Sequence, residues 1–307
     1  MRISPRTNPI RIITLIALVL CISPRAEAKL VFSFGVEGSY HDNVIGLVQD
    51  NPNLGGTTGG TGYMGGSGGM SILPAPQNGL NNNPGGTGSG TGMGTGGDQN
   101  VQQGDFSATL SADIGRKTSW GDKTDVLLLA AVSHTAFATY DEFNFTVGSV
   151  SAGMTRYLTD VLSARFSVKA AEKKFENPLR DSSAFGASAG LKETVNDNLW
   201  FKQAYEFEKN HADSPLYTYQ GHSATAWIGL SLSEDTSLDL GYGCLVRSYD
   251  LPEGFKVTTQ NISVSLTADL SDSWSCSLGY DHEMADSNVP GTTTTNNISS
   301  IGLRYNY

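Results

Sequence analysis

The chain has 307 residues, with 20 basic and 30 acidic side chains and a formal net charge of -10. Nucleic-acid binding requires a basic stripe, so this acidic composition indicates no nucleic-acid partner. After residue 28 no apolar run approaches the roughly twenty residues of a membrane-spanning helix. The chain is therefore either an exported soluble protein or a barrel that crosses a membrane with strands.

Residues 1–28 have the organisation of a secretory signal peptide. Residues 12–22 are apolar, and Ala26-Glu-Ala28 is a small-x-small cleavage site. Cys21 raises the alternative of a lipoprotein, but Leu20 before it is too large for a typical lipid-attachment motif. We expect cleavage after Ala28. The preceding basic residues are Arg2, Arg6 and Arg11.

Two strands with period-two alternation follow the signal peptide. Residues 30–40 place Leu30, Phe32, Phe34 and Val36 on one face, and residues 106–114 repeat the pattern. Alternation of this kind predicts a half-buried strand. In a membrane barrel the apolar face meets lipid and the polar face lines the lumen.

Five aspartates recur at spacings of 37 or 38 residues in short polar clusters between apolar runs. Asp, Asn, Ser and Thr favour tight turns because their side chains hydrogen-bond the nearby backbone. A fixed period implies a repeating unit, here a hairpin of two strands of about ten residues. The predicted periplasmic turns are at Asp122, Asp160, Asp197, Asp235 and Asp272.

The strands expected at 124–138 and 142–156 are less regular. Val126 to Val132 is apolar on both faces, and the parity of Phe143 and Phe145 does not match that of Val150, Ala152 and Met154. A β-bulge would restore the register. We therefore predict both strands and a bulge in the second.

From residue 162 the alternation returns and continues to the final strand, where Ile301, Leu303, Tyr305 and Tyr307 share a face. A strand that ends on an aromatic residue resembles the terminal signature of bacterial outer-membrane proteins. Residues 29–307 thus predict an all-β fold: a closed antiparallel transmembrane barrel of about twelve strands with short periplasmic turns and long outer loops. The outer loops are expected at 41–104, 139–142, 172–184, 209–221, 249–256 and 284–296. An aromatic girdle beside the periplasmic rim is expected from Tyr157, Trp200, Trp274, Tyr305 and Tyr307.

The first outer loop, about 42–104, holds more than half of the chain's 36 glycines. This composition cannot bury enough apolar surface to offset the entropy of ordering, which predicts a disordered surface loop. A plug folded into the lumen and a surface tuft are the alternatives. A phosphate-binding loop is excluded, because the required strand, lysine and helix context is missing.

The inward positions of the predicted strands carry many charges. A basic wall on the fifth to seventh strands would face an acidic wall on the eleventh, twelfth and first, as charged linings do in selective pores. Cross-lumen pairing that closes the barrel is the alternative. The predicted pore-lining residues are Glu37, Asp113, Arg165, Lys169, Lys192, Lys202, Glu206, Arg247, Asp281, Glu283 and Arg304.

No motif for catalysis, metal binding or a cofactor is recognised. His41 beside Asp42 and His211 near Asp213 are expected at the outer rim, but no nucleophile motif accompanies them. Cys244 and Cys276 are predicted on strands that are not neighbours, so no disulfide is expected. We predict that the protein is not an enzyme.

The stretch Gly38-Ser-Tyr40-His-Asp42-Asn43 resembles the start of the barrel in putative β-barrel porin families. The resemblance implies a porin-like protein of the bacterial outer membrane, with membrane lipids and the barrel-assembly machinery as partners. Passive diffusion of small hydrophilic solutes is the leading hypothesis. The alternative is a closed barrel that serves as a surface scaffold, or as the membrane sleeve of an export or electron-transfer complex.

Overall fold

Twelve antiparallel strands form one closed barrel in the computed structural model, which describes residues 28–43, 104–252, 254–288 and 293–307. The signal peptide up to residue 27 and residues 44–103 of the glycine-rich loop lie outside the described residues, so both predictions stay untested. The strands are β1 (Ala28–His41), β2 (Asp105–Ser119), β3 (Thr124–Phe137), β4 (Phe145–Tyr157), β5 (Leu162–Phe175), β6 (Ser182–Asn196), β7 (Leu199–Ala212), β8 (Tyr219–Ser231), β9 (Thr236–Tyr249), β10 (Lys256–Asp269), β11 (Trp274–Ser287) and β12 (Thr294–Asn306).

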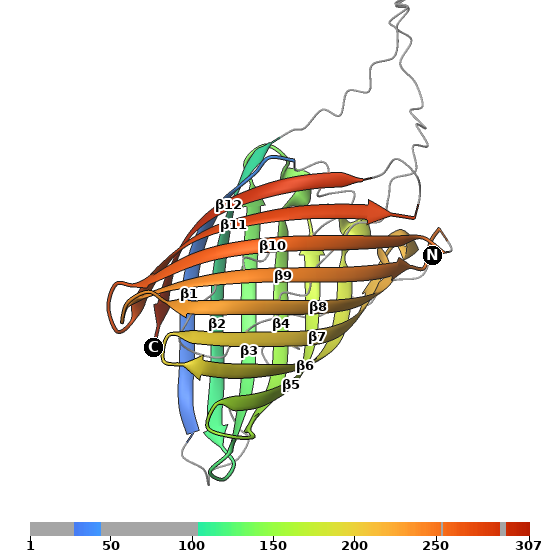
Figure 1. Cartoon of the computed structure of the whole chain (residues 1–307). Coiled ribbons are helices and arrows are strands. Elements are labelled where there is room, and N and C mark those ends of the chain that lie inside the picture. The colour runs from blue at the N-terminus through green and yellow to red at the C-terminus, as the bar shows by residue number, and fades with distance from the viewer. Residues whose placement is uncertain (1–27, 44–103, 253, 289–292) are drawn as a thin grey trace, which may run out of the picture.

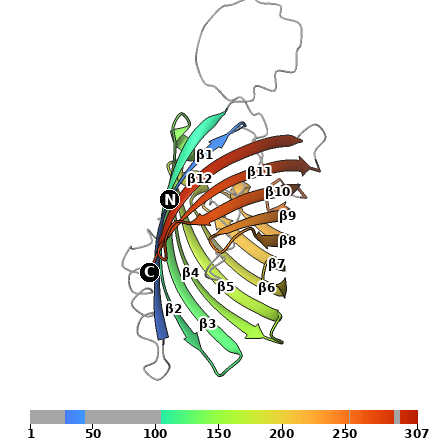
Figure 2. The same ribbon diagram turned by 60° about the vertical axis from the view of Figure 1, so that its left-hand side comes forward.

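Pairing between β1 and β12 closes the sheet and confirms the predicted barrel of twelve strands. Each strand pairs with its sequence neighbours, and β1 pairs with β12 from Ser33↔Asn306 to His41↔Ile298. Figure 2 shows these two strands side by side. In Figure 1 the front strands β6–β12 cross steeply over β1–β4 behind them, as strand tilt in a closed barrel requires. Among the described residues, no helix has the length and apolarity to span a membrane.

The outward face is an apolar belt, as the alternation predicted. Residues that pair across antiparallel strands share a face, so the registers extend the outward set of β1 around the whole barrel. Large apolar side chains exposed on a closed sheet have the character of a lipid-facing surface. They include Phe34, Leu110, Phe166, Val168, Phe185, Leu240, Val264, Leu278 and Ile301.

Aromatic side chains border this belt at both ends. At one border the Trp274 and Tyr305 ring centroids are 5.2 Å apart. At the other, outward tyrosines hydrogen-bond polar neighbours, as in the 2.8 Å bond that Tyr280 donates to Asn297. Such amphipathic rings suit a membrane interface. The prediction was wrong for Trp200, which faces the lumen.

The five repeated aspartates all lie between consecutive strands at one end of the barrel, which we call the turn end. The turns are tight: Leu158 N–H donates to the carbonyl of Leu162, and Leu270 N–H to that of Trp274. The first turn contains Gly121 at φ 71°, a conformation that favours glycine. The hairpin repeat is thereby confirmed in its geometry.

At the opposite end, the loop end, β5 to β8, β11 and β12 extend further than predicted. The connections are 138–144, 176–181, 213–218, 250–255 and 288–293, so the intervals expected at 172–184, 209–221 and 284–296 were too long, whereas that expected at 139–142 was too short. Three of them contain a 3₁₀ turn: η1 (Asp141–Phe143), η2 (Pro178–Arg180) and η3 (Pro215–Tyr217). The strand lengths were underestimated because the strands continue beyond the apolar belt, where their residues are polar.

The predicted bulge in β4 was wrong. β4 pairs without a register shift with both β3 and β5, and among the described strands the recorded shift lies at Thr194/Asn196. Phe145 pairs with Thr135 and faces inward, where it packs against Phe137. Its parity looked irregular because part of the inward face at the loop end is aromatic.

Replacing a side chain in the middle of the apolar belt with a charge should destabilise the barrel. Leu278→Arg should lower the free energy of unfolding in lipid vesicles by about 2–4 kcal/mol, because arginine is costly at mid-bilayer depth. Thr295→Arg, outward near the loop end of β12, should cost about 0–1 kcal/mol. Equilibrium denaturation followed by tryptophan fluorescence measures both. Equal costs would contradict the placement of the belt.

Candidate functional site: the barrel lumen

The registers place all eleven residues predicted to line a pore on the inward face. The pairing Lys169↔Gly186↔Glu208↔Gly221↔Arg247 runs across five strands, and Asp281↔Ile298↔His41 continues another row to β1. Their role in conduction stays a prediction. The inward set is Glu37, Asp113, Arg165, Lys169, Lys192, Lys202, Glu206, Arg247, Asp281, Glu283 and Arg304.

Several of these charges interact within their own wall as well as facing the opposite one. Arg304 Nη2 donates to Asp113 Oδ1 at 2.8 Å and to Ser33 Oγ at 2.7 Å, bridging β12, β1 and β2. Lys169 on β5 lies within electrostatic range of Glu206 and Glu208 on β7. The basic wall is thus partly compensated by the carboxylates of β7.

The loop end carries an inward ring of aromatic side chains, which we call the aromatic collar. It consists of two packed clusters, one beside β3 and β4 and the other beside β8 to β11. Phe143, Tyr217 and Phe255 come from the connections and the other rings from strand ends, and together they narrow this end of the lumen on the β3–β10 side. Its members are Phe137, Phe143, Phe145, Phe175, Tyr217, Tyr219, Tyr249 and Phe255.

Arg180, in the loop between β5 and β6, joins the two clusters of the collar. Its Cζ lies 4.7 Å from the ring centroid of Phe175, 5.5 Å from that of Phe143 and 5.7 Å from that of Tyr217. Burial lowers the pKa of the Arg180 guanidinium, and the nearby Glu142 opposes that shift. An arginine stays charged at neutral pH, so these contacts are cation–π interactions.

Two buried cations lie next to the collar. Lys173 was not placed in the lumen by the sequence analysis, and Arg247 was placed there without a prediction of its burial. Lys173 is 1% exposed and Arg247 is fully buried, with its guanidinium 5.0 Å from the ring centroid of Tyr219. Tyr219 in turn donates a hydrogen bond to Glu208. The parity of Arg165 and Lys169 would have identified Lys173 as inward had its strand been extended past residue 172.

In the turn-end half of the lumen two tryptophans lie against glycines of the next strand. A Cβ built on Gly229 would lie 2.0 Å from Trp200, and one on Gly241 would lie 2.6 Å from Trp227. The missing side chains let these indoles cover β8 and β9 and narrow the lumen. Lys192 Nζ lies 4.8 Å from the ring centroid of Trp200.

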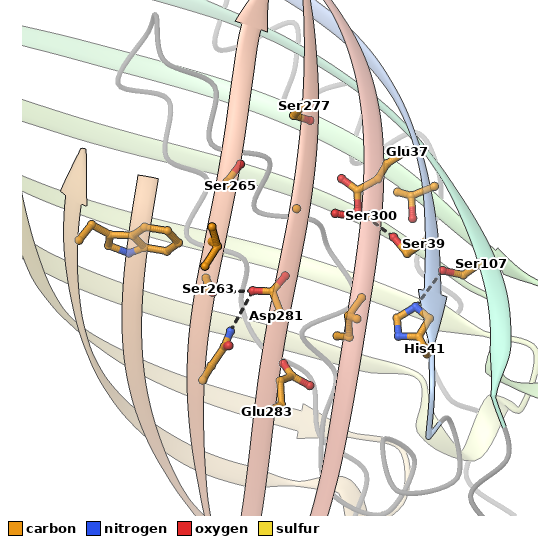
Figure 3. Close-up of a pocket in the computed structure, with 16 residues that line it drawn as sticks. Glu37, Ser39, His41, Ser107, Ser263, Ser265, Ser277, Asp281, Glu283 and Ser300 are labelled. Atoms are coloured by element: carbon orange, nitrogen blue, oxygen red, sulfur yellow. Dashed lines mark hydrogen bonds between the residues drawn. The ribbon is translucent and has the colours of Figure 1, made fainter. Parts of the chain in front are cut away.

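The space left beside the collar is a polar pocket between β1, β2 and β10–β12 (Figure 3). It encloses about 700 Å³, including the part open to solvent. Glu37 enters it from β1, and Asp281 and Glu283 enter from β11. Serines from neighbouring strands and Trp227 complete the lining.

The histidines do not converge on a metal. Among the described residues, no group of three or more His, Cys, Asp or Glu side chains is placed to hold a metal ion. His134 and His222 face outward, and His41 Nε2 lies 3.0 Å from Ser107 Oγ. Cys244 and Cys276 are free and face outward, on strands separated by β10.

No protein-family model matches the sequence, and no curated protein matches it significantly. The fold is similar to that of a solved outer-membrane channel from Pseudomonas putida F1, at 8% identity and a TM-score of 0.56 over 93% of this chain and 100% of that chain. The KdgM porin in complex with disordered oligogalacturonate is 10% identical, with a TM-score of 0.39 over 65% of this chain and 94% of that one. An anion-selective porin from Comamonas acidovorans is 8% identical, with a TM-score of 0.39 over 92% and 100%. The chain has the fold of an outer-membrane channel.

The indole of Trp227 depends on the glycine beneath it. Gly241→Ala should displace the ring, shift the tryptophan emission and lower the free energy of unfolding by about 1–3 kcal/mol, as overpacking does. Gly243→Ala, on the same face of β9, is the matched control because its nearest atom would be 3.7 Å away. Denaturation and near-ultraviolet circular dichroism measure both variants. Identical stability and spectra for Gly241→Ala and Gly243→Ala would contradict the close approach of the Trp227 indole to Gly241.

Proposed function

We propose that this protein is a porin-like channel of the bacterial outer membrane through which small hydrophilic solutes diffuse. The observation that carries the proposal is the lumen pocket, lined by carboxylates and hydroxyls inside a barrel whose outer surface is apolar. A polar lining replaces part of the hydration that a solute loses on entering a narrow passage. The turn end would face the periplasm, and insertion would depend on the barrel-assembly machinery.

The eleven inward charges would set which solutes pass. The basic side chains of β5 to β7 and the acidic side chains of β1 and β11 project into one narrow space, where low polarisability strengthens their fields. Such a lining favours polar over apolar solutes. We therefore retain Lys202 and Glu283 as pore-lining residues of opposite charge.

A barrel held closed by its collar is the second candidate. It is favoured by the burial of Lys173 and Arg247 and by the contacts of Arg180 with three rings from different segments. In that case the barrel would act as a scaffold or membrane sleeve. Conductance separates the two functions.

We assign no catalytic residue. His41 and Ser107 form a hydrogen-bonded pair, but the carboxylate of Asp105 accepts hydrogen bonds from the backbone amides of Phe106, Thr139 and Tyr140. Asp105 is therefore bound to backbone amides and does not orient the His41 imidazole. An acyl-transfer triad requires a carboxylate in that orienting role.

The refolded protein should produce stepwise openings in a planar bilayer. Lys202→Gln and Glu283→Gln remove opposite charges from the lumen, so they should shift the reversal potential in a salt gradient in opposite directions. A bilayer that stays silent would overturn the channel proposal and favour the closed barrel. Heat-modifiable gel migration establishes beforehand that each sample is folded.

Loosening the collar should increase the open fraction. Arg180→Ala removes cation–π contacts worth about 1–2 kcal/mol, which corresponds to roughly a five- to thirtyfold change in the ratio of open to closed states. Lys209→Ala, an exposed outward lysine at the same end, controls for loss of one positive charge. Single-channel recording measures the open probability. An unchanged value in Arg180→Ala would show that the collar does not gate the lumen.

A further inference from the structure

The pocket in Figure 3 has an electrostatic character that the lumen as a whole does not share. Its lining includes three carboxylates, those of Glu37, Asp281 and Glu283, but no lysine or arginine among the described residues. Lys202 on β7 pairs with Trp227 on β8, whereas Gly241 of β9 pairs with Trp227 from the other side, toward β10. The pocket is therefore negative, although basic residues are abundant elsewhere in the barrel.

The protein's own hydrogen bonds leave part of the Glu37 and Asp281 carboxylates available. Ser263 and Asn261 both donate to Asp281 Oδ1, and Ser39 donates to Glu37 Oε1 at 3.1 Å. The hydrogen bonds among the described residues thus engage one oxygen of Asp281 and one of Glu37. Carboxylates that share a pocket repel one another, so a bound cation would relieve that repulsion.

His41 supplies an independent indication of a ligand. The side chain is 1% exposed and lines the pocket, and its Nδ1 has no hydrogen-bond partner among the described residues while Nε2 contacts Ser107. A buried ring nitrogen without a partner is costly unless another group satisfies it. A hydroxyl or similar polar group on a ligand would do so.

We propose that this pocket is a binding subsite for small organic cations carrying an ammonium group and a polar tail, selected through Asp281, Glu283, Glu37 and the indole of Trp227. The inference deepens the proposed channel function by naming the solute class that the lumen favours. The carboxylates do not converge closely enough to hold a metal ion, whereas an ammonium group is larger and tolerates wider spacing. An indole face attracts organic cations through cation–π interaction, which favours this class over inorganic ions.

Equilibrium dialysis of the folded, detergent-solubilised full chain against radiolabelled choline tests the proposal. We expect saturable binding at one site that glucose and acetate displace poorly. Asp281→Asn and Glu283→Gln should each weaken binding about tenfold, and Trp227→Leu should weaken it severalfold. Glu208→Gln, which removes an inward carboxylate on β7 outside the pocket, should change choline binding less than about twofold.

The outcomes distinguish this site from the channel itself, because dialysis needs no conduction and conductance needs no saturable site. Absence of saturable choline binding would overturn the subsite even if the barrel conducts. Displacement by glucose at equal concentration would identify a neutral polyol site instead. Equal weakening in Glu208→Gln would reduce the effect to the overall charge of the lumen and would also overturn the proposal. Binding that persists in a protein with no conductance would retain the subsite and reject the channel.

Discussion

The closure of β12 onto β1 is the constraint on which the rest of the molecule depends. A sheet in lipid cannot leave backbone amides and carbonyls unpaired, and the ladder between Ser33↔Asn306 and His41↔Ile298 removes both edges at once. Closure assigns alternate residues of every strand to opposite environments. The apolar belt and the charged lumen are two results of that one geometric condition.

Closure also forces large side chains of the inward face into a narrow space, and the chain accommodates them in two ways. In the turn-end half of the barrel, glycines lie beneath the indoles of Trp200 and Trp227, so bulky rings occupy the space of missing side chains. At the loop end, short 3₁₀ turns carry Phe143, Arg180 and Tyr217, and the buried Arg180 guanidinium packs against both partly buried rings. In the polar pocket beside β1 and β11, serines outnumber aromatic rings.

Errors in the sequence analysis arose where an inward position carried an apolar residue or a strand continued beyond the belt. Phe145 suggested a bulge because an inward face was assumed to be polar, yet its neighbours at that height are rings from adjacent strands and loops. Lys173 was assigned to a loop because polar residues on both faces hide the period of two. Trp200 was placed on the rim because parity near a strand end depends on the register across the turn.

The sequence by itself determined the number of strands, the positions of the tight turns and the inward face of the eleven charged residues predicted to line the lumen. These properties depend on alternation and turn chemistry, which are local. Only the tertiary structure decided that Arg180 links two aromatic clusters, that Lys173 and Arg247 are buried, and that Glu37 shares a pocket with Asp281 and Glu283. Those relations depend on which residues meet across the lumen, and that is set by the register and tilt of all twelve strands together.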